Sequence, residues 1–187
     1  MSVSQEIKIV FAGPMGAGKT TAIRALSDQL PVSTEVTNTE RTRNTKATTT
    51  VALDFGQLNL RDGTAVRLYG TPGQGRFSFM WEILCEGSLG VILLLDGRSA
   101  TAQADLDLYI DALRELGQEQ PIVVGVGRLP VDCGQALDRL VSALAARGIV
   151  APVFGVDVRN RDDVLLLVDT LLCILEMRVP ECLDGLH

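Results

Sequence analysis

Runs of apolar residues and patterns typical of helices alternate along the chain. The apolar runs are short and continuous, as is usual for strands buried on both faces of a parallel sheet. The segment 102–116 instead repeats its apolar residues with helical spacing, at Leu106, Tyr109, Ile110 and Leu113. The predicted strands are 7–12, 91–96, 122–126 and 153–156, and the predicted helices are 18–30, 102–116, 133–147 and 161–176.

Two further segments, 51–60 and 65–69, predict strands joined by a tight turn. Asp62-Gly63 lies between them, and this dipeptide is a strong hairpin signal. A hairpin adds an antiparallel strand, whereas strands that alternate with helices pair in parallel. We therefore expect an α/β fold, in one domain over residues 1–187. Its sheet should have six mostly parallel strands with one antiparallel edge strand, and helices on both faces.

The stretch from 31 to 48 is polar and rich in Thr, Asn, Arg and Lys, so it predicts a loop. A loop of this length inside a compact domain is usually functional. In a parallel sheet, ligands bind beyond the carboxyl ends of the strands. We therefore expect any ligand of this fold to bind at that edge.

Composition narrows the classes of protein. The 187 residues are 47% hydrophobic and 21% charged, which is ordinary for a globular domain. A net charge of -6 and a pI near 4.8 argue against nucleic acid as the main partner. The longest apolar run, 89–95, is too short to span a bilayer, and no secretory signal, lipidation motif or metal-type cysteine pair is visible. We expect a cytoplasmic protein with no integral membrane segment.

A glycine-rich motif follows the first predicted strand. Residues 13–20 read G-x-x-x-x-G-K-T, which is the complete Walker A pattern of a phosphate loop. Its backbone N–H groups and the next helix would cradle the phosphates of a nucleotide. Lys19 would reach the β- and γ-phosphates and assist catalysis, and the Thr20 hydroxyl would ligate Mg²⁺. The predicted nucleotide-binding residues here are Gly13, Pro14, Met15, Gly16, Ala17, Gly18, Lys19, Thr20 and Thr21.

A second motif, Pro72-Gly73-Gln74, follows the strand that ends near Tyr69. With the phosphate loop, it resembles the switch II entry of Ras-like small GTPases, and most closely that of the MglA-type bacterial branch. The resemblance implies a P-loop NTPase fold of Ras-like type that binds GTP or GDP with Mg²⁺. It implies that the Gly73 N–H senses the γ-phosphate and that Gln74 is catalytic, because it orients the attacking water.

The same resemblance implies a threonine ligand to Mg²⁺ from switch I. Three consecutive threonines precede the second strand, and we favour Thr50 because Asp54-Phe55 follows it as in MglA-type proteins. MglA-type proteins carry an arginine just before this threonine, where this chain has Thr49. Arg41, Arg43 and Lys46 are alternatives for that cation.

Three departures bear on hydrolysis. Gly70 stands where Ras-like proteins place a carboxylate that holds Mg²⁺ through water, and Asp54 on the adjacent strand is a candidate replacement. Met15 would crowd the γ-phosphate. Together with the missing arginine, these changes predict slow hydrolysis without a partner.

The base site departs from the guanine motif. Asn-Lys-x-Asp is replaced by Gly127-Arg128-Leu129-Pro130, so the carboxylate that pairs with guanine is absent. Arg128 would stack on the base, and Asp157 would accept a hydrogen bond from a guanine N–H. The choice of guanine rests on the resemblance.

The leading hypothesis is a GTP-dependent switch whose segments 31–50 and 70–87 are read by a partner. The resemblance implies a Roadblock-domain regulator, with an effector that the sequence does not identify. One alternative is a nucleotide-binding module with little hydrolysis or relaxed preference between ATP and GTP, and another is a small-molecule kinase. A short helical segment is also predicted after residues 70–75, ending near Gly87, and Trp81 within it is a core residue or part of a partner surface.

Overall fold

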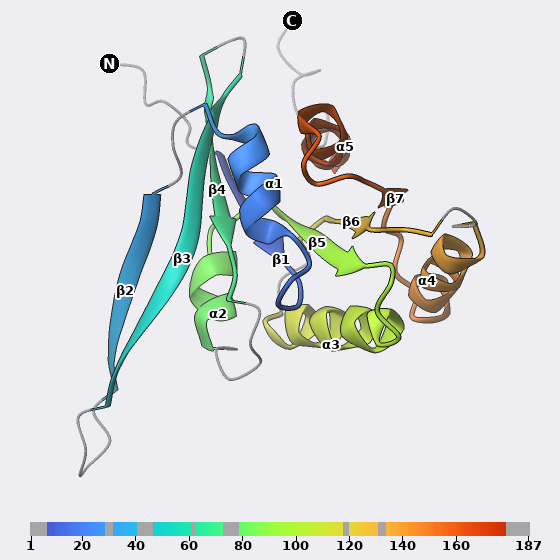
Figure 1. Cartoon of the computed structure of the whole chain (residues 1–187), viewed down its shortest axis with the longest axis horizontal. Helices are drawn as coiled ribbons and strands as arrows, with labels where there is room; N and C mark the ends of the chain where they lie inside the picture. The colour runs from blue at the N-terminus through green and yellow to red at the C-terminus, as the bar shows by residue number, and fades with distance from the viewer. Residues whose placement is uncertain are drawn as a thin grey trace, which may run out of the picture.

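Strands of a single sheet form the centre of the molecule (Figure 1). The computed structural model describes residues 7–28, 32–40, 47–60, 63–72, 79–117, 120–130 and 134–178, and within them seven strands lie in the order β2-β3-β4-β1-β5-β6-β7. The strands are β1 (Ile7–Ala12), β2 (Val32–Glu40), β3 (Ala47–Asn59), β4 (Ala65–Gly70), β5 (Gly90–Asp96), β6 (Ile122–Gly127) and β7 (Val153–Gly155). The helices are α1 (Lys19–Leu26), α2 (Phe79–Cys85), α3 (Ala102–Glu115), α4 (Gly134–Ala146) and α5 (Arg161–Arg178).

The direction of the strands confirms the predicted fold class. Strands β4, β1, β5, β6 and β7 pair in parallel, and β3 pairs antiparallel with both β4 and β2. The sheet is therefore mostly parallel with one strand, β3, that runs against the others. Because β1, β5, β6 and β7 end at the same edge, the loops that follow them meet there.

The prediction of a loop from 31 to 48 is wrong, because most of this segment is strand. Residues Val32–Glu40 form β2, and β3 begins at Ala47, so the sheet gains a seventh strand outside the predicted antiparallel edge. The segment is polar, but five of its nine residues are Val or Thr, whose β-branched side chains favour extended backbone. Figure 1 shows β2 and the first half of β3 projecting as a two-stranded ribbon, since β4 pairs with β3 only from Asp54 to Asn59.

Two apolar layers cover the sheet. Alternate residues of β1 point to opposite faces, so that Val10 packs with the layer of α2, α3 and α4, while Phe11 packs with the layer of α1 and α5. Trp81 belongs to the first layer, where it is 5% exposed and stacks on Tyr109 with ring centroids 4.4 Å apart. Trp81 is thus a core residue. No helix among the described residues is long and apolar enough to cross a membrane.

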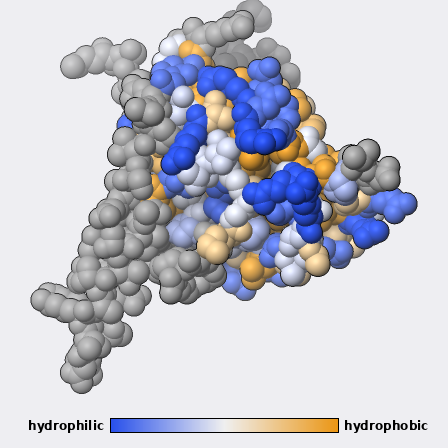
Figure 2. Space-filling model, in the orientation of Figure 1, coloured by the Kyte–Doolittle hydropathy of each residue, from blue (hydrophilic) through white to orange (hydrophobic). Residues whose placement is uncertain are grey.

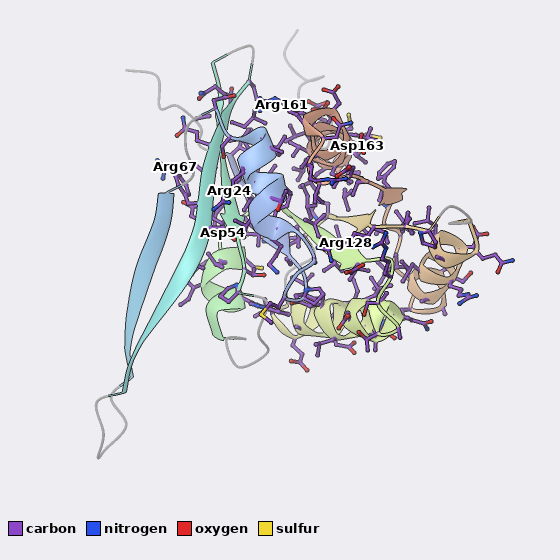
Figure 3. All side chains as sticks on the ribbon, viewed as in Figure 1. Arg24, Asp54, Arg67, Arg128, Arg161 and Asp163 are labelled. Carbon is purple, nitrogen blue, oxygen red and sulfur yellow. The ribbon has the colours of Figure 1, made fainter. Side chains whose placement is uncertain are left out.

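Hydrogen bonds from α5 hold the C-terminal end of α1 in place. The Arg161 guanidinium donates to the carbonyl oxygens of Ala25 (2.9 Å) and Leu26 (2.7 Å) and to the Asp28 carboxylate (3.1 Å). These bonds satisfy carbonyl groups that a helix end leaves without intrahelical partners. Figure 3 shows Arg161 at this junction. The helix that follows the phosphate loop is therefore held at its far end.

Candidate nucleotide site

The glycine-rich loop connects the end of β1 to the start of α1. Its three glycines, Gly13, Gly16 and Gly18, have φ values of 141°, 83° and 98°. Those values lie in the region that residues with a side chain rarely adopt. A Cβ on Gly13 would also overlap the carbonyl oxygen of Leu94 on β5. The loop conformation therefore depends on the glycines of the Walker A pattern.

Lys19 is buried inside this loop. The residue is only 7% exposed, and its Nζ donates to the carbonyl oxygens of Gly13 (2.6 Å) and Pro14 (2.8 Å). An ammonium group has three protons, so one remains for a ligand. Burial lowers the pKa of Lys19 to about 8, and the negative charge of Asp54 opposes that shift. The loop thus holds a buried cation that an anionic ligand would stabilise.

Thr20 and Asp54 form a polar pair beside Lys19. The Thr20 hydroxyl donates to Oδ2 of Asp54 over 2.5 Å. Asp54 lies opposite Gly70 in the register of β3 and β4. A Cβ on Gly70 would lie 3.0 Å from the Asp54 Cβ and 3.3 Å from its Oδ2. The carboxylate on β3 therefore lies next to a position on β4 that has no side chain, and its role as a replacement carboxylate for Mg²⁺ stays a prediction.

A cleft of about 480 Å³ opens over these groups. Lys19, Thr20, Asp54 and Gly70 line it, and Met15 is 76% exposed at its rim. In Figure 2 the most hydrophilic side chains lie over α1 and to its right, beside a paler area between α1 and α3. The cleft has the size and charge for the phosphates of a nucleotide.

A second cavity of about 760 Å³ adjoins the first, at the ends of β5, β6 and β7. Arg128 lies between the two cavities: its Nη2 donates to the Gly16 carbonyl (2.8 Å), and its Nη1 pairs with Oδ2 of Asp96 (2.6 Å). Its φ of 54° is unusual for a residue with a side chain, and such strain is common at ligand sites. Figure 3 shows Arg128 and Asp54 on opposite sides of α1.

Asp157 lines the second cavity, but its carboxylate already accepts hydrogen bonds from a neighbouring arginine. It accepts hydrogen bonds from Nε (2.9 Å), Nη2 (2.7 Å) and the backbone N–H (3.0 Å) of Arg159. The side-chain bond from Arg159 is the main cause that lowers the pKa of Asp157 to about 2. A guanine N–H would have to compete with Arg159 for this carboxylate.

Most predicted site residues lie together. Residues 13–21 form the loop and the start of α1, and Arg128 and Asp157 line the adjoining cavity. Gly73, Gln74, Arg41, Arg43 and Lys46 lie outside the described residues, as does the side chain of Thr50, so their predicted roles stay predictions. Sequence reasoning missed Asp96, although a polar residue at the carboxyl end of the apolar run 91–95 is a usable signal.

Comparison with known proteins gives the family. The model of a family described as conserved hypothetical ATP binding proteins matches residues 31–140. An uncharacterized protein of Methanocaldococcus jannaschii is 31% identical over 103 residues, which are 55% of this chain and 59% of the relative. The chain thus spans less than two thirds of that relative's length. The family match begins after the phosphate loop, so the loop is an independent indication of nucleotide binding.

The predicted membership of the MglA-type bacterial small GTPases is wrong. The matched family is one of ATP binding proteins, and the relative is an archaeal protein of no assigned function. The resemblance rested on a phosphate loop, which many nucleotide-binding families share, and on a tripeptide, Pro72-Gly73-Gln74, too short to separate them. The Roadblock-domain regulator was implied only by that resemblance and stays an untested prediction. This chain is a nucleotide-binding α/β protein that belongs to the family of conserved hypothetical ATP binding proteins.

Proposed function

We propose that the protein binds a nucleoside triphosphate with Mg²⁺ and hydrolyses it slowly. The observation that carries the proposal is Lys19, whose buried ammonium group is held by two loop carbonyls at the floor of the cleft. A buried cation with one free proton fits the β- and γ-phosphates. The family description adds support for a nucleotide as the ligand.

The residues beside Lys19 fit Mg²⁺. The Thr20 hydroxyl donates its hydrogen bond to Asp54, which leaves the lone pairs of the hydroxyl oxygen for a cation. Mg²⁺ prefers hard oxygen ligands, keeps several waters and commonly takes one or two protein groups together with substrate phosphates. Thr20 would hold the ion directly and Asp54 would hold it through water. The bound ion would neutralise charge on the phosphates.

The base site supports weak discrimination between purines. Both acidic side chains that line the second cavity, Asp96 and Asp157, are paired with arginines. The N–H groups of guanine would have to compete with these arginines for the carboxylates, which weakens any preference for guanine. The planar guanidinium groups of Arg128 and Arg159 can stack on either purine. We propose that ATP and GTP both bind.

Equilibrium titration with fluorescent ATP and GTP analogues at fixed Mg²⁺ tests this function. We expect the two dissociation constants to agree within about tenfold, which is a free-energy difference of about 1.4 kcal/mol. A preference of a hundredfold or more for either base would contradict weak discrimination. Failure of both nucleotides to bind at millimolar concentration would contradict the function itself.

We expect slow hydrolysis because of two residues that line the cleft, Gly70 and Met15. Gly70 brings no carboxylate, and the exposed Met15 stands at the rim, where a second cation would approach the terminal phosphate. A missing arginine of that kind lowers phosphoryl-transfer rates by about 10³–10⁵-fold. We propose that turnover rises only when a partner supplies this group.

Nucleotide affinity should fall as the pH rises above about 8. The pKa of Lys19 is about 8 in the free protein because burial disfavours its charge, and bound phosphates would raise it. Between these two pKa values binding takes up one proton, so affinity falls about tenfold per pH unit. Titration from pH 7 to 9.5 measures this. Lys19→Arg keeps its charge throughout, so its weaker binding should show no such slope.

A further inference from the structure

Thr71, which directly follows β4, carries an unused hydroxyl. The residue is 3% exposed, and its Oγ1 is buried with no hydrogen-bond partner. Its backbone N–H is satisfied by the Phe11 carbonyl at 2.9 Å, so the backbone is fixed while the hydroxyl is not used. Burial of an unpartnered hydroxyl costs stability, and native proteins keep few such groups. The hydroxyl therefore needs an explanation beyond packing.

The surroundings of Thr71 point to a ligand. It lines the same cleft as Lys19, Thr20 and Asp54. Gly70, the residue before it, has no side chain, and a Cβ there would crowd Asp54 and the Ile23 Cδ1 at 3.1 Å. The end of β4 thus offers no carboxylate to the cleft. The residue that follows β4 and lines the cleft is Thr71.

We propose that the Thr71 hydroxyl hydrogen-bonds a water of the hydrated Mg²⁺ when the ion and a nucleotide occupy the cleft; this rests on the function proposed above. Mg²⁺ keeps several of its waters, and these need partners in the protein wall. Asp54 supplies one such partner from β3, and Thr71 supplies another from the end of β4. Without ligand the hydroxyl is left unpaired.

Thr71→Val and Thr71→Ser test the proposal, because valine keeps the shape and serine keeps the hydroxyl. The free Thr71→Val protein should melt at the same temperature as the wild type or higher. With fluorescent ATP, its half-saturating Mg²⁺ concentration should rise about threefold to tenfold, the range expected for one lost hydrogen bond. Thr71→Ser should require no more Mg²⁺ than the wild type. As a matched control, Thr170→Val removes a hydroxyl that donates to Leu166 on α5, and it should leave the Mg²⁺ dependence unchanged.

Three results would overturn the inference. If Thr71→Val needs the same Mg²⁺ concentration as the wild type, the hydroxyl serves no water of the ion, although the proposed function stands. If the loss of affinity is equally large in EDTA, the hydroxyl contacts phosphate instead. If the wild type binds no nucleotide, the function and the inference fail together. Should Thr71→Val not fold, Thr71→Ala against Thr71→Ser gives the same comparison.

Discussion

Replacement of Lys19 by methionine is expected to weaken the binding of Mg²⁺-ATP about 100-fold to 1,000-fold, or about 3–4 kcal/mol. The ammonium group is buried in the loop, and two of its protons already bond Gly13 and Pro14. A charge in such a position meets phosphate with little competition from water, so the interaction is much stronger than an exposed ion pair. Methionine keeps the length and the apolar stem but has no charge.

The same substitution should change the stability of the free protein little. The lowered pKa of Lys19 shows that burial of its charge is unfavourable, and methionine removes that cost. Two carbonyl oxygens lose a donor, which opposes the gain. Titration with fluorescent ATP and urea unfolding measure the two effects separately. The contrast between lost affinity and kept stability identifies a binding residue.

Lys8→Met is the matched control. Lys8 is also a partly buried lysine that donates to backbone carbonyls, those of Ile83 (3.4 Å) and Glu86 (2.7 Å), but it holds the end of α2 rather than the cleft. Its loss should lower stability and leave nucleotide affinity within a few-fold of the wild type. Wild-type affinity in Lys19→Met would show that the cleft does not hold the phosphates.

The apolar pattern predicts most of the fold because it reports burial. β5 is apolar along its length since both of its faces are covered, and α3 shows one apolar face since only that face packs on the sheet. The apolar pattern does not predict β2, which has no continuous apolar run. It lies at the edge of the sheet, without a further strand beyond it among the described residues. A strand at an edge can be polar throughout, so its sequence shows β-branched residues without the continuous apolar run of a central strand.

A candidate site can be read from the sequence where its residues are consecutive. Lys19 and Thr20 are the first residues of α1, directly after the glycine-rich loop, and the spacing of the motif indicates their chemistry. Asp54 faces Gly70, and Asp96 faces Gly127 beside Arg128, only through pairing between strands. Such proximity depends on register, which a single sequence does not state. The unpaired hydroxyl of Thr71 depends on the absence of a neighbour and has no signature in the sequence at all.

Gly13→Ala is expected to destabilise the protein by about 3–5 kcal/mol. Two costs add: a φ of 141° costs about 1–3 kcal/mol for a residue with a side chain, and a Cβ would overlap the Leu94 carbonyl oxygen on β5. Because the obstacle is backbone of a central strand, it cannot turn aside as a flexible side chain would. Urea unfolding of the free protein measures the loss.

Gly16→Ala separates the two costs. Gly16 has a φ of 83° in the same loop, but a Cβ there would meet no atom within 4 Å. Only the backbone strain remains, so we expect a loss of about 1 kcal/mol. If the two substitutions cost the same, backbone conformation alone would explain both glycines, and the contact of the loop with β5 would contribute nothing. A larger loss for Gly13→Ala means that the packing of β1 against β5 fixes where the loop begins, and with it the two carbonyls that hold Lys19.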